Sequence, residues 1–263
     1  ENEGSCIVKW SYKTGKVVDT LLTSNMAFGD ARETFGGYEF SSDERFVVLT
    51  TASEGLYRHS FYANFYVYDF DANEDARPIT DFSLGKQRLA QLSPAGDKVA
   101  FVRENNIFIS DLATGDEIQV TTDGVTNAII NGATDWVYEE EFGDDQGLFW
   151  NGDGSRLAYL KFDESNVREF HMPVYGSLYP DPYTFKYPKA GEDNSDVSVH
   201  IYTLAEDKSR AVAVPKSAHY IPRIKWTKDP ATLCIFTMNR HQNDLRLLLT
   251  EGEFPNDRLG TKE

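Results

Sequence analysis

The chain has 263 residues, 40% of them hydrophobic and 13% aromatic, so it can bury a sizeable core as one large domain or two small ones. Its 42 acidic and 26 basic residues give a net charge of −16. This balance argues against nucleic acid or an anionic membrane as a partner, because both need a basic surface.

Few residues point to redox or metal chemistry. Cys6 and Cys234 lie far apart and match no metal or redox spacing, so the sequence leaves a disulfide between them open. The five histidines are scattered along the chain, and their spacing predicts no zinc site. No apolar run is long enough for a transmembrane helix. The chain starts at Glu1 without an initiator Met, so we expect a mature or trimmed product and infer little from the lack of a secretory signal.

The elements expected along the chain are almost all strands. Residues 5–22 predict a hairpin around a Lys-Thr-Gly-Lys turn. A polar turn followed by an apolar strand then recurs, and a further strand follows the first three copies. The copies are residues 38–49, 92–102, 150–160 and, more weakly, 226–236. Residues 178–189 contain three prolines and are expected as an extended loop, because proline disrupts a regular ladder.

Repeats at intervals of roughly 50 to 75 residues are typical of propeller blades built from four antiparallel strands. The alternative is a β-sandwich, whose strands also carry regular turn signals. The recurring turn before each apolar strand favours the propeller. We therefore predict an all-β fold, a partial β-propeller of about four blades that looks unfinished at its C-terminus.

The most unusual stretch is residues 135–142, where Glu139, Glu140 and Glu141 stand between aromatic residues. Adjacent carboxylates repel, so such a run forms either a solvated turn or a cation site. Charge runs are usually solvated, which favours the turn. The flanking aromatic residues favour the cation site, because low-dielectric walls strengthen a contact between carboxylate and ammonium. The stretch is predicted as an insertion between the second and third clear blades, and such insertions build binding sites.

No catalytic motif is present. The sequence lacks a Gly-x-Ser-x-Gly elbow, a P-loop, a dinucleotide fingerprint, an EF-hand loop and a His-Glu-x-x-His helix. We expect no cofactor and no metal, and any nucleophile would lie outside these residues. Arg58, between the two strands of the first clear blade, is either a structural ion-pair partner or a ligand for a carbonyl or carboxylate.

Three segments in order resemble motifs of the dipeptidyl peptidase IV family of serine exopeptidases. They are the arginine-bearing segment at residues 57–69, the double-glutamate motif at residues 135–142 and a Tyr-Pro-Lys-Ala-Gly loop within residues 185–194. The likeness runs from about residue 35 to residue 204, and its loops look more like those of bacterial members than those of animal members.

The resemblance implies an eight-bladed propeller that caps an α/β-hydrolase domain with a Ser-Asp-His triad. Residues 1–263 would be the N-terminal part of that propeller, about four of its eight blades. The hydrolase domain is not in this chain, so no catalytic residue is assigned. Glu140 and Glu141 would bind the α-ammonium group of the substrate, Glu139 would be structural, and Arg58 would contact a backbone carbonyl of the substrate.

The function implied is that of a serine-type dipeptidyl aminopeptidase that releases X-Pro, and less well X-Ala, from peptides with a free N-terminus. Partners would be these peptides, the protein's own hydrolase domain and a second copy in a homodimer. The location would be secreted, periplasmic or membrane-tethered. Two alternatives remain: a non-catalytic propeller that binds peptides or proteins, and a tripeptidyl-cleaving relative.

Overall fold

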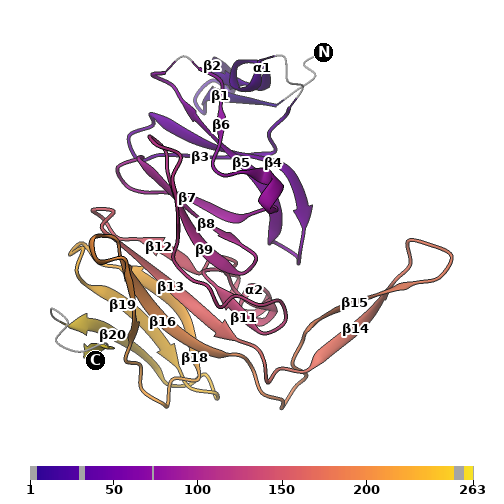
Figure 1. Ribbon diagram of the computed structural model, residues 1–263, viewed down its shortest axis with the longest axis vertical. Coiled ribbons are helices and arrows are strands. Elements are labelled where there is room, and N and C mark those ends of the chain that lie inside the picture. Colours follow the sequence, from indigo (N-terminus) through magenta and orange to yellow (C-terminus); the bar gives the residue numbers. More distant parts are fainter. Residues whose placement is uncertain (1–4, 30–32, 73, 252–257, 263) are drawn as a thin grey trace.

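A computed structural model describes residues 5–29, 33–72, 74–251 and 258–262. Successive antiparallel sheets are stacked along the molecule from the N-terminus to the C-terminus, and one hairpin projects from the body (Figure 1). The chain opens with the predicted hairpin, β1 (Cys6–Ser11) and β2 (Lys16–Thr23), followed by the short helix α1 (Ser24–Phe28). Cys6 and Cys234 are both free, so the disulfide left open by the sequence is not formed.

Four blades follow the hairpin, and each contains one of the predicted repeats. Blades one and two are regular four-stranded sheets whose strands pair in chain order. Blade one consists of β3 (Gly37–Phe40), β4 (Phe46–Gly55), β5 (Phe61–Asp69) and β6 (Arg77–Pro78). Blade two follows a 3-10 turn at Phe82–Leu84 and consists of β7 (Arg88–Leu92), β8 (Lys98–Arg103), β9 (Asn106–Asp111) and β10 (Glu117–Gln119).

Blades three and four are joined at their edges, because β17 and β21 pair in parallel. Blade three consists of β12 (Leu148–Trp150), β13 (Arg156–Asp163), β16 (Asp196–Thr203) and β17 (Lys208–Val212), with a 3-10 turn at Leu204–Glu206. The short strand β11 (Ile129–Asn131) pairs with the far end of β13. Blade four consists of β18 (Tyr220–Trp226), β19 (Leu233–Met238), β20 (Leu245–Glu251) and β21 (Arg258–Lys262).

The core is divided into layers between neighbouring sheets. Side chains alternate across a strand, so a strand covered on both faces carries an unbroken apolar run. In β4, Phe46 and Val48 pack towards blade two, whereas Val47 and Leu49 pack towards the N-terminal hairpin. The apolar residues of β8 divide in the same way between blades one and three. This sharing explains why the strand after each turn is almost wholly hydrophobic.

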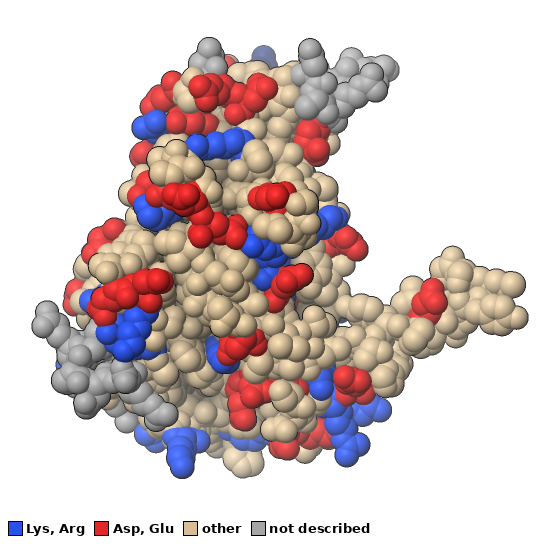
Figure 2. Space-filling model, in the orientation of Figure 1, with Lys and Arg blue, Asp and Glu red and all other residues tan. Residues whose placement is uncertain are grey.

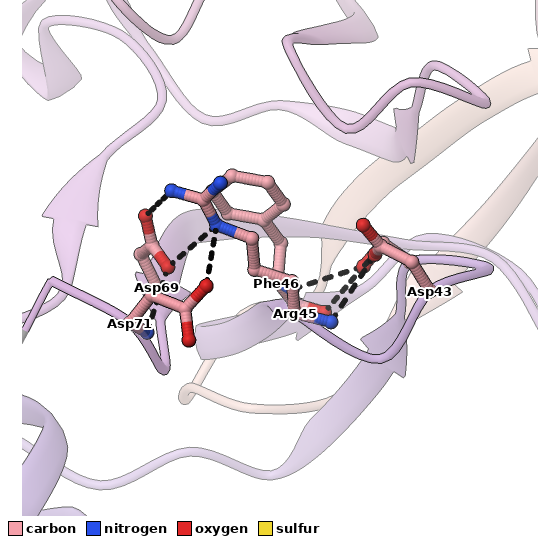
Figure 3. Close-up of polar contacts among 6 residues, drawn as sticks. Asp43, Arg45, Phe46, Asp69 and Asp71 are labelled. Carbon is pink, nitrogen blue, oxygen red and sulfur yellow. Dashed lines mark hydrogen bonds and ion pairs between the residues drawn. The ribbon is translucent and has the colours of Figure 1, made fainter.

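The recurring turn has one geometry in the first three blades. A side-chain oxygen at its start accepts a hydrogen bond from the backbone amide five residues later, with distances of 2.9, 3.1 and 3.0 Å. The acceptors are Ser41, Ser93 and Asn151. In blade one, the Arg45 guanidinium also contacts Asp69 and Asp71 and lies over the ring of Phe46 (Figure 3). These bonds confirm that the repeats share a structural basis.

Tryptophans connect successive blades. The indole N–H of Trp150 donates to the Gln91 carbonyl of blade two at 3.1 Å. In the next blade, the indole N–H of Trp226 donates to the Phe149 carbonyl of blade three at 2.9 Å. Both tryptophans are the last residue of a first strand, so one type of contact sets the stacking of adjacent blades.

The prediction of an extended loop at residues 178–189 was wrong for the central part of this segment. β15 (Asp181–Lys186) pairs along its length with β14 (Glu169–Val174) in a two-stranded ribbon. This ribbon is the hairpin that projects from the body in Figure 1. Pro173 faces Pro182, so the two missing N–H donors fall at one position of the ladder. Both strands are edge strands, where proline is tolerated.

Candidate functional site

The glutamate-rich stretch forms a short helix, so its interpretation as a solvated turn was wrong. The helix α2 (Trp136–Phe142) starts where the Asp135 carboxylate accepts a hydrogen bond from the Tyr138 amide at 2.9 Å, a usual capping contact of aspartate. It ends at Gly143, whose φ of 63° and ψ of 38° suit glycine. Asp135, Tyr138 and Glu139 are buried.

Three hydrogen bonds attach α2 to blades three and four. One lies at the start of the helix, one in its middle and one at its end, so the helix cannot rotate without breaking a contact. The Tyr138 ring also packs edge-on against Phe162 of β13, with 4.8 Å between ring centroids. The three bonds join Ser195 Oγ to Asp135 at 2.6 Å, Ile221 N to the Tyr138 hydroxyl at 2.8 Å, and Arg223 Nη2 to the Phe142 carbonyl at 2.6 Å.

Glu139 attaches the helix to blade one. Its side chain is 1% exposed, and its Oε1 accepts hydrogen bonds from the backbone amides of His59 at 2.6 Å and Ser60 at 2.9 Å. Bonds from N–H donors to an ionised carboxylate are stronger than neutral ones. The loop that carries Arg58 is therefore held against α2. This geometry is the structural role that the resemblance implies for Glu139.

Glu140 and Arg58 meet across 82 positions of sequence. The Nε of Arg58 lies 3.0 and 2.9 Å from the two carboxylate oxygens of Glu140. The Arg58 side chain is 68% exposed and that of Glu140 is 17% exposed, so solvent screens the pair and its contribution to stability is small. Arg58 is consequently held near α2 while most of its guanidinium faces outward.

Glu141 is exposed and makes no hydrogen bond or ion pair with any residue that the structure describes. It follows Glu140 in the last turn of α2. The C-terminal end of a helix carries a partial negative charge, so two carboxylates there are electrostatically unfavourable. A bound cation would relieve both the helix end and the repulsion between Glu140 and Glu141.

Two buried carboxyl groups have raised pKa values, Asp135 at the start of α2 and Glu164 after β13. Burial raises the pKa of Asp135 above its ordinary value, although the bond from Ser195 acts in the opposite direction. Burial, together with the negative charge of Asp135, raises the pKa of Glu164 to about 7. Glu164 follows β13 and is itself buried. This carboxyl therefore changes charge in the neutral pH range.

Comparison with known proteins places the chain in a family. The family model described as the dipeptidyl peptidase IV (DPP IV) N-terminal region matches residues 41–259. The chain belongs to this family. Among solved structures, Porphyromonas gingivalis dipeptidyl peptidase 4 is 44% identical, with a TM-score of 0.87 over 95% of this chain and 36% of that one. The four blades therefore correspond to a portion of the propeller of that family.

Curated relatives support the same membership. The probable dipeptidyl-aminopeptidase B of Podospora anserina is 36% identical over 71% of this chain and 22% of its own length. The protein of that name from Talaromyces marneffei is 32% identical over 80% of this chain and 25% of its own length. The chain is thus homologous to serine peptidases of the dipeptidyl peptidase IV and aminopeptidase B type. It spans about a quarter of the length of these relatives.

The described residues were searched for metal sites and for membrane-spanning helices. Within them, no group of three or more His, Cys, Asp or Glu side chains could hold a metal ion. No helix in the same part of the chain is long and apolar enough to cross a membrane.

Sequence reasoning did not find the residues that hold the site in place. Asp135 before the stretch and Gly143 after it are start and stop signals of a helix and could have predicted α2. Ser195 and Ile221 carried no such signal, because each meets α2 across at least 60 positions. The three predicted residues fall in one region: Arg58 and Glu140 are in contact, and Glu141 is next to them on α2.

Proposed function

We propose that this chain recognises the free N-terminus of peptides for a serine dipeptidyl peptidase that releases X-Pro and, less well, X-Ala. The observation that supports this proposal most is the pair Glu140 and Glu141 on a short helix attached to three blades. One of the two carboxylates is already positioned by Arg58. Family membership supplies the reaction class, and the catalytic triad would belong to an α/β-hydrolase domain outside these residues.

The chemistry of a peptide N-terminus fits the two carboxylates. An α-amino group has a pKa of about 8 and is mostly protonated at neutral pH. It then offers three N–H donors, of which Glu140 and Glu141 can accept two as charge-assisted bonds. The bound ammonium also offsets the repulsion at the C-terminal end of α2. The two carboxylates thus bind a positively charged N-terminus and do not require a particular substrate side chain.

Arg58 would supply the second contact. Its Nε faces Glu140, and its terminal nitrogens remain available to donate to a substrate carbonyl. Two fixed contacts on the amino-terminal residues set the distance from the N-terminus to the cleaved bond. Such an arrangement explains why an enzyme would remove a dipeptide and leave internal bonds intact.

The test is neutralisation of the two carboxylates in the full-length enzyme. Glu140→Gln and Glu141→Gln should each lower kcat/KM for a free-amine X-Pro anilide by at least about tenfold, because a charged hydrogen bond is lost. Glu54→Gln is the matched control: this exposed glutamate pairs with Lys86, and we expect wild-type kinetics. Wild-type kinetics in both site variants would refute the proposal.

The same enzyme should discriminate by N-terminus and by product length. An N-acetylated X-Pro peptide would leave both carboxylates without their partner and should be cleaved far more slowly than the free amine. Mass spectrometry of products from a longer X-Pro peptide should show a dipeptide. Release of a tripeptide would instead identify a tripeptidyl-cleaving enzyme.

We extend the proposal to the assembly and its location. The projecting ribbon β14–β15 supports a homodimer, because it exposes six apolar residues. They are Phe170, Met172, Val174, Tyr175, Leu178 and Tyr179.

A secreted, periplasmic or membrane-tethered location rests on the resemblance alone, and cell fractionation with antibody detection would test it.

A further inference from the structure

The projecting ribbon β14–β15 is exposed along most of its length but packed at its root, the end next to the body. Every residue of β14 is exposed, whereas Phe185 near the end of β15 is 9% exposed. Phe185 pairs with Phe170 in the ladder, and the Tyr187 amide closes the root by donating to the Arg168 carbonyl at 3.0 Å. A two-stranded hairpin is marginally stable by itself in water, so the ribbon depends on contacts at this end.

An aromatic cluster forms the root. The Phe185 ring lies 6.0 Å from Phe170, 5.4 Å from Tyr183 and 6.0 Å from Tyr187, measured between ring centroids. The rings of Phe170 and Tyr187 are 5.5 Å apart. All four pairs are tilted or edge-on, which is a favourable arrangement of aromatic rings at these separations. These four contacts join the ribbon to the residue just after it and fix the shape of the root.

Two further contacts of the cluster leave the ribbon and reach the peptide site. The Tyr57 ring lies 6.0 Å from Phe185, and Tyr57 directly precedes Arg58. The Trp136 ring lies 4.4 Å from Tyr187, and Trp136 is the first residue of α2. The root therefore contacts both of the segments that carry the predicted site residues.

The Arg58 turn is attached at two neighbouring points. The Leu56 amide donates to the Ser60 carbonyl at 2.9 Å, so residues 56–60 form a closed turn. Glu139 of α2 accepts hydrogen bonds from the two amides that follow Arg58, and Phe185 contacts the ring that precedes it. Arg58 thus lies in the chain between an attachment to α2 and an attachment to the ribbon.

We propose that Phe185 and Tyr187 are positioning residues for the peptide site. Their rings hold the Arg58 turn and the first turn of α2 in fixed places, so that Arg58 and Glu140 stay in contact. A cluster that served the ribbon alone would need no contact outside it, yet two of its rings reach residues next to the site. The effect on peptide binding rests on the proposed function.

The kinetic test uses the full-length enzyme and a free-amine X-Pro anilide. Phe185→Leu and Tyr187→Ser each remove a ring and should raise KM by about three- to tenfold, with less than about a twofold change in kcat, because substrate binding is altered and the bond-cleaving residues are not. Tyr187→Phe keeps the ring and should stay within about twofold of wild type. Unchanged KM in both ring-removing variants, or equal impairment in Tyr187→Phe and Tyr187→Ser, would overturn the inference.

A second readout does not depend on peptidase activity. Hydrogen–deuterium exchange of a peptide covering residues 57–61 should be faster in Phe185→Leu than in wild type, and that of a peptide covering residues 136–142 should be faster in Tyr187→Ser. Faster exchange supports the positioning role even if the protein cleaves no peptide, so failure of the proposed function is told apart from failure of this inference. Wild-type exchange in both variants would refute it. If Phe185→Leu does not fold, the half-buried Tyr187 carries both tests.

Two controls separate positioning from other effects. Phe108 in blade two is 8% exposed and stacks on Phe101 at 5.7 Å, so Phe108→Leu should lower Tm and leave KM and the exchange of residues 57–61 unchanged. Leu178→Asp changes the outer part of the ribbon but not its root, and it should also leave that exchange unchanged. A comparable rise in KM for Phe108→Leu would indicate general destabilisation, and faster exchange in Leu178→Asp would indicate an effect of the outer ribbon. Either result would overturn the inference.

Discussion

Glu139, Glu140 and Glu141 show how neighbouring residues of one type acquire different roles. Successive side chains on a helix point about 100° apart, so the three carboxylates meet different surroundings. Glu139 turns into the protein and accepts two backbone amides, Glu140 contacts Arg58, and Glu141 faces solvent. The role of each glutamate therefore depends on where its side chain points more than on its residue type.

Arg58→Ala tests whether this arginine serves binding or stability. Because its side chain is 68% exposed, removal of its ion pair should change the free energy of unfolding by less than about 1 kcal/mol. Turnover of a free-amine X-Pro substrate should nevertheless fall, because a substrate contact is lost and Glu140 is less fixed. The measurements are steady-state kinetics and thermal denaturation. A lower Tm with normal kinetics would make Arg58 a structural residue.

Glu164→Gln should change the pH dependence of stability. An acid whose pKa rises from 4.5 to about 7 on folding binds its proton more tightly in the folded state. Stability is therefore lost as the pH rises between these two values and is constant above them. The amide variant avoids this loss, so its advantage should be negligible at pH 4 and on the order of 1–3 kcal/mol at pH 8. Chemical denaturation at both pH values measures it, and equal differences at both would contradict the shifted pKa.

At the scale of elements, α2 is too short to be stable by itself, since isolated helices of fewer than about 12 residues are marginal in water. Its capping aspartate and its hydrogen bonds to blades three and four supply the stability that helix propensity does not. The glutamates at the C-terminal end of the helix oppose helix formation. The helix therefore depends on tertiary contacts, and its side chains are placed by those contacts.

Ser195→Ala should loosen α2 at its capping residue, Asp135. The buried Asp135 carboxylate would lose its 2.6 Å bond, at an expected cost of about 1–3 kcal/mol in the free energy of unfolding. KM for a free-amine peptide should rise as well, because Glu140 and Glu141 lie on the same helix. Ser198→Ala removes a hydroxyl that contacts His200 close by in the chain and serves as control. Equal effects of the two variants would argue against a special role for Ser195.

At the scale of the molecule, the described residues form a stack of sheets from which one ribbon projects (Figure 1). On the face shown in Figure 2, acidic and basic side chains are interspersed over the body, whereas the outer part of the ribbon is almost free of charge. An apolar ribbon that extends from a charged body favours contact with another protein surface. We therefore propose that the homodimer forms through the ribbon and not through the blades.

Leu178→Asp tests this arrangement, since Leu178 is 91% exposed on the ribbon. A charge at this position should shift the full-length protein from dimer to monomer in light scattering and leave its Tm unchanged. Leu84→Asp, at a half-exposed leucine of the body, is the matched control and should remain dimeric. A monomeric wild type, or dimers in both variants, would exclude the ribbon as the dimer contact.

Local patterns predicted most of the fold. The turns at Ser41, Ser93 and Asn151 are formed by residues within five positions of one another, so the repeat was visible in the sequence. The pairing of residues 181–186 was missed because proline was taken to exclude a ladder, although a two-stranded ribbon consists of edge strands. The helix at residues 136–142 was not predicted, because its run of glutamates was interpreted as a charged turn although Asp135 and Gly143 flank it as capping residues.

The sequence by itself determined the all-β repeat, the absence of catalytic motifs and the three segments that resemble one family, since each depends on residues close together in the chain. Only the tertiary structure decided that Arg58 meets Glu140 and that Glu139 turns inward to the amides of His59 and Ser60. These contacts join blade one to the helix α2 across as many as 82 positions of sequence. Their geometry follows from how the sheets stack, and short-range patterns carry no record of that stacking.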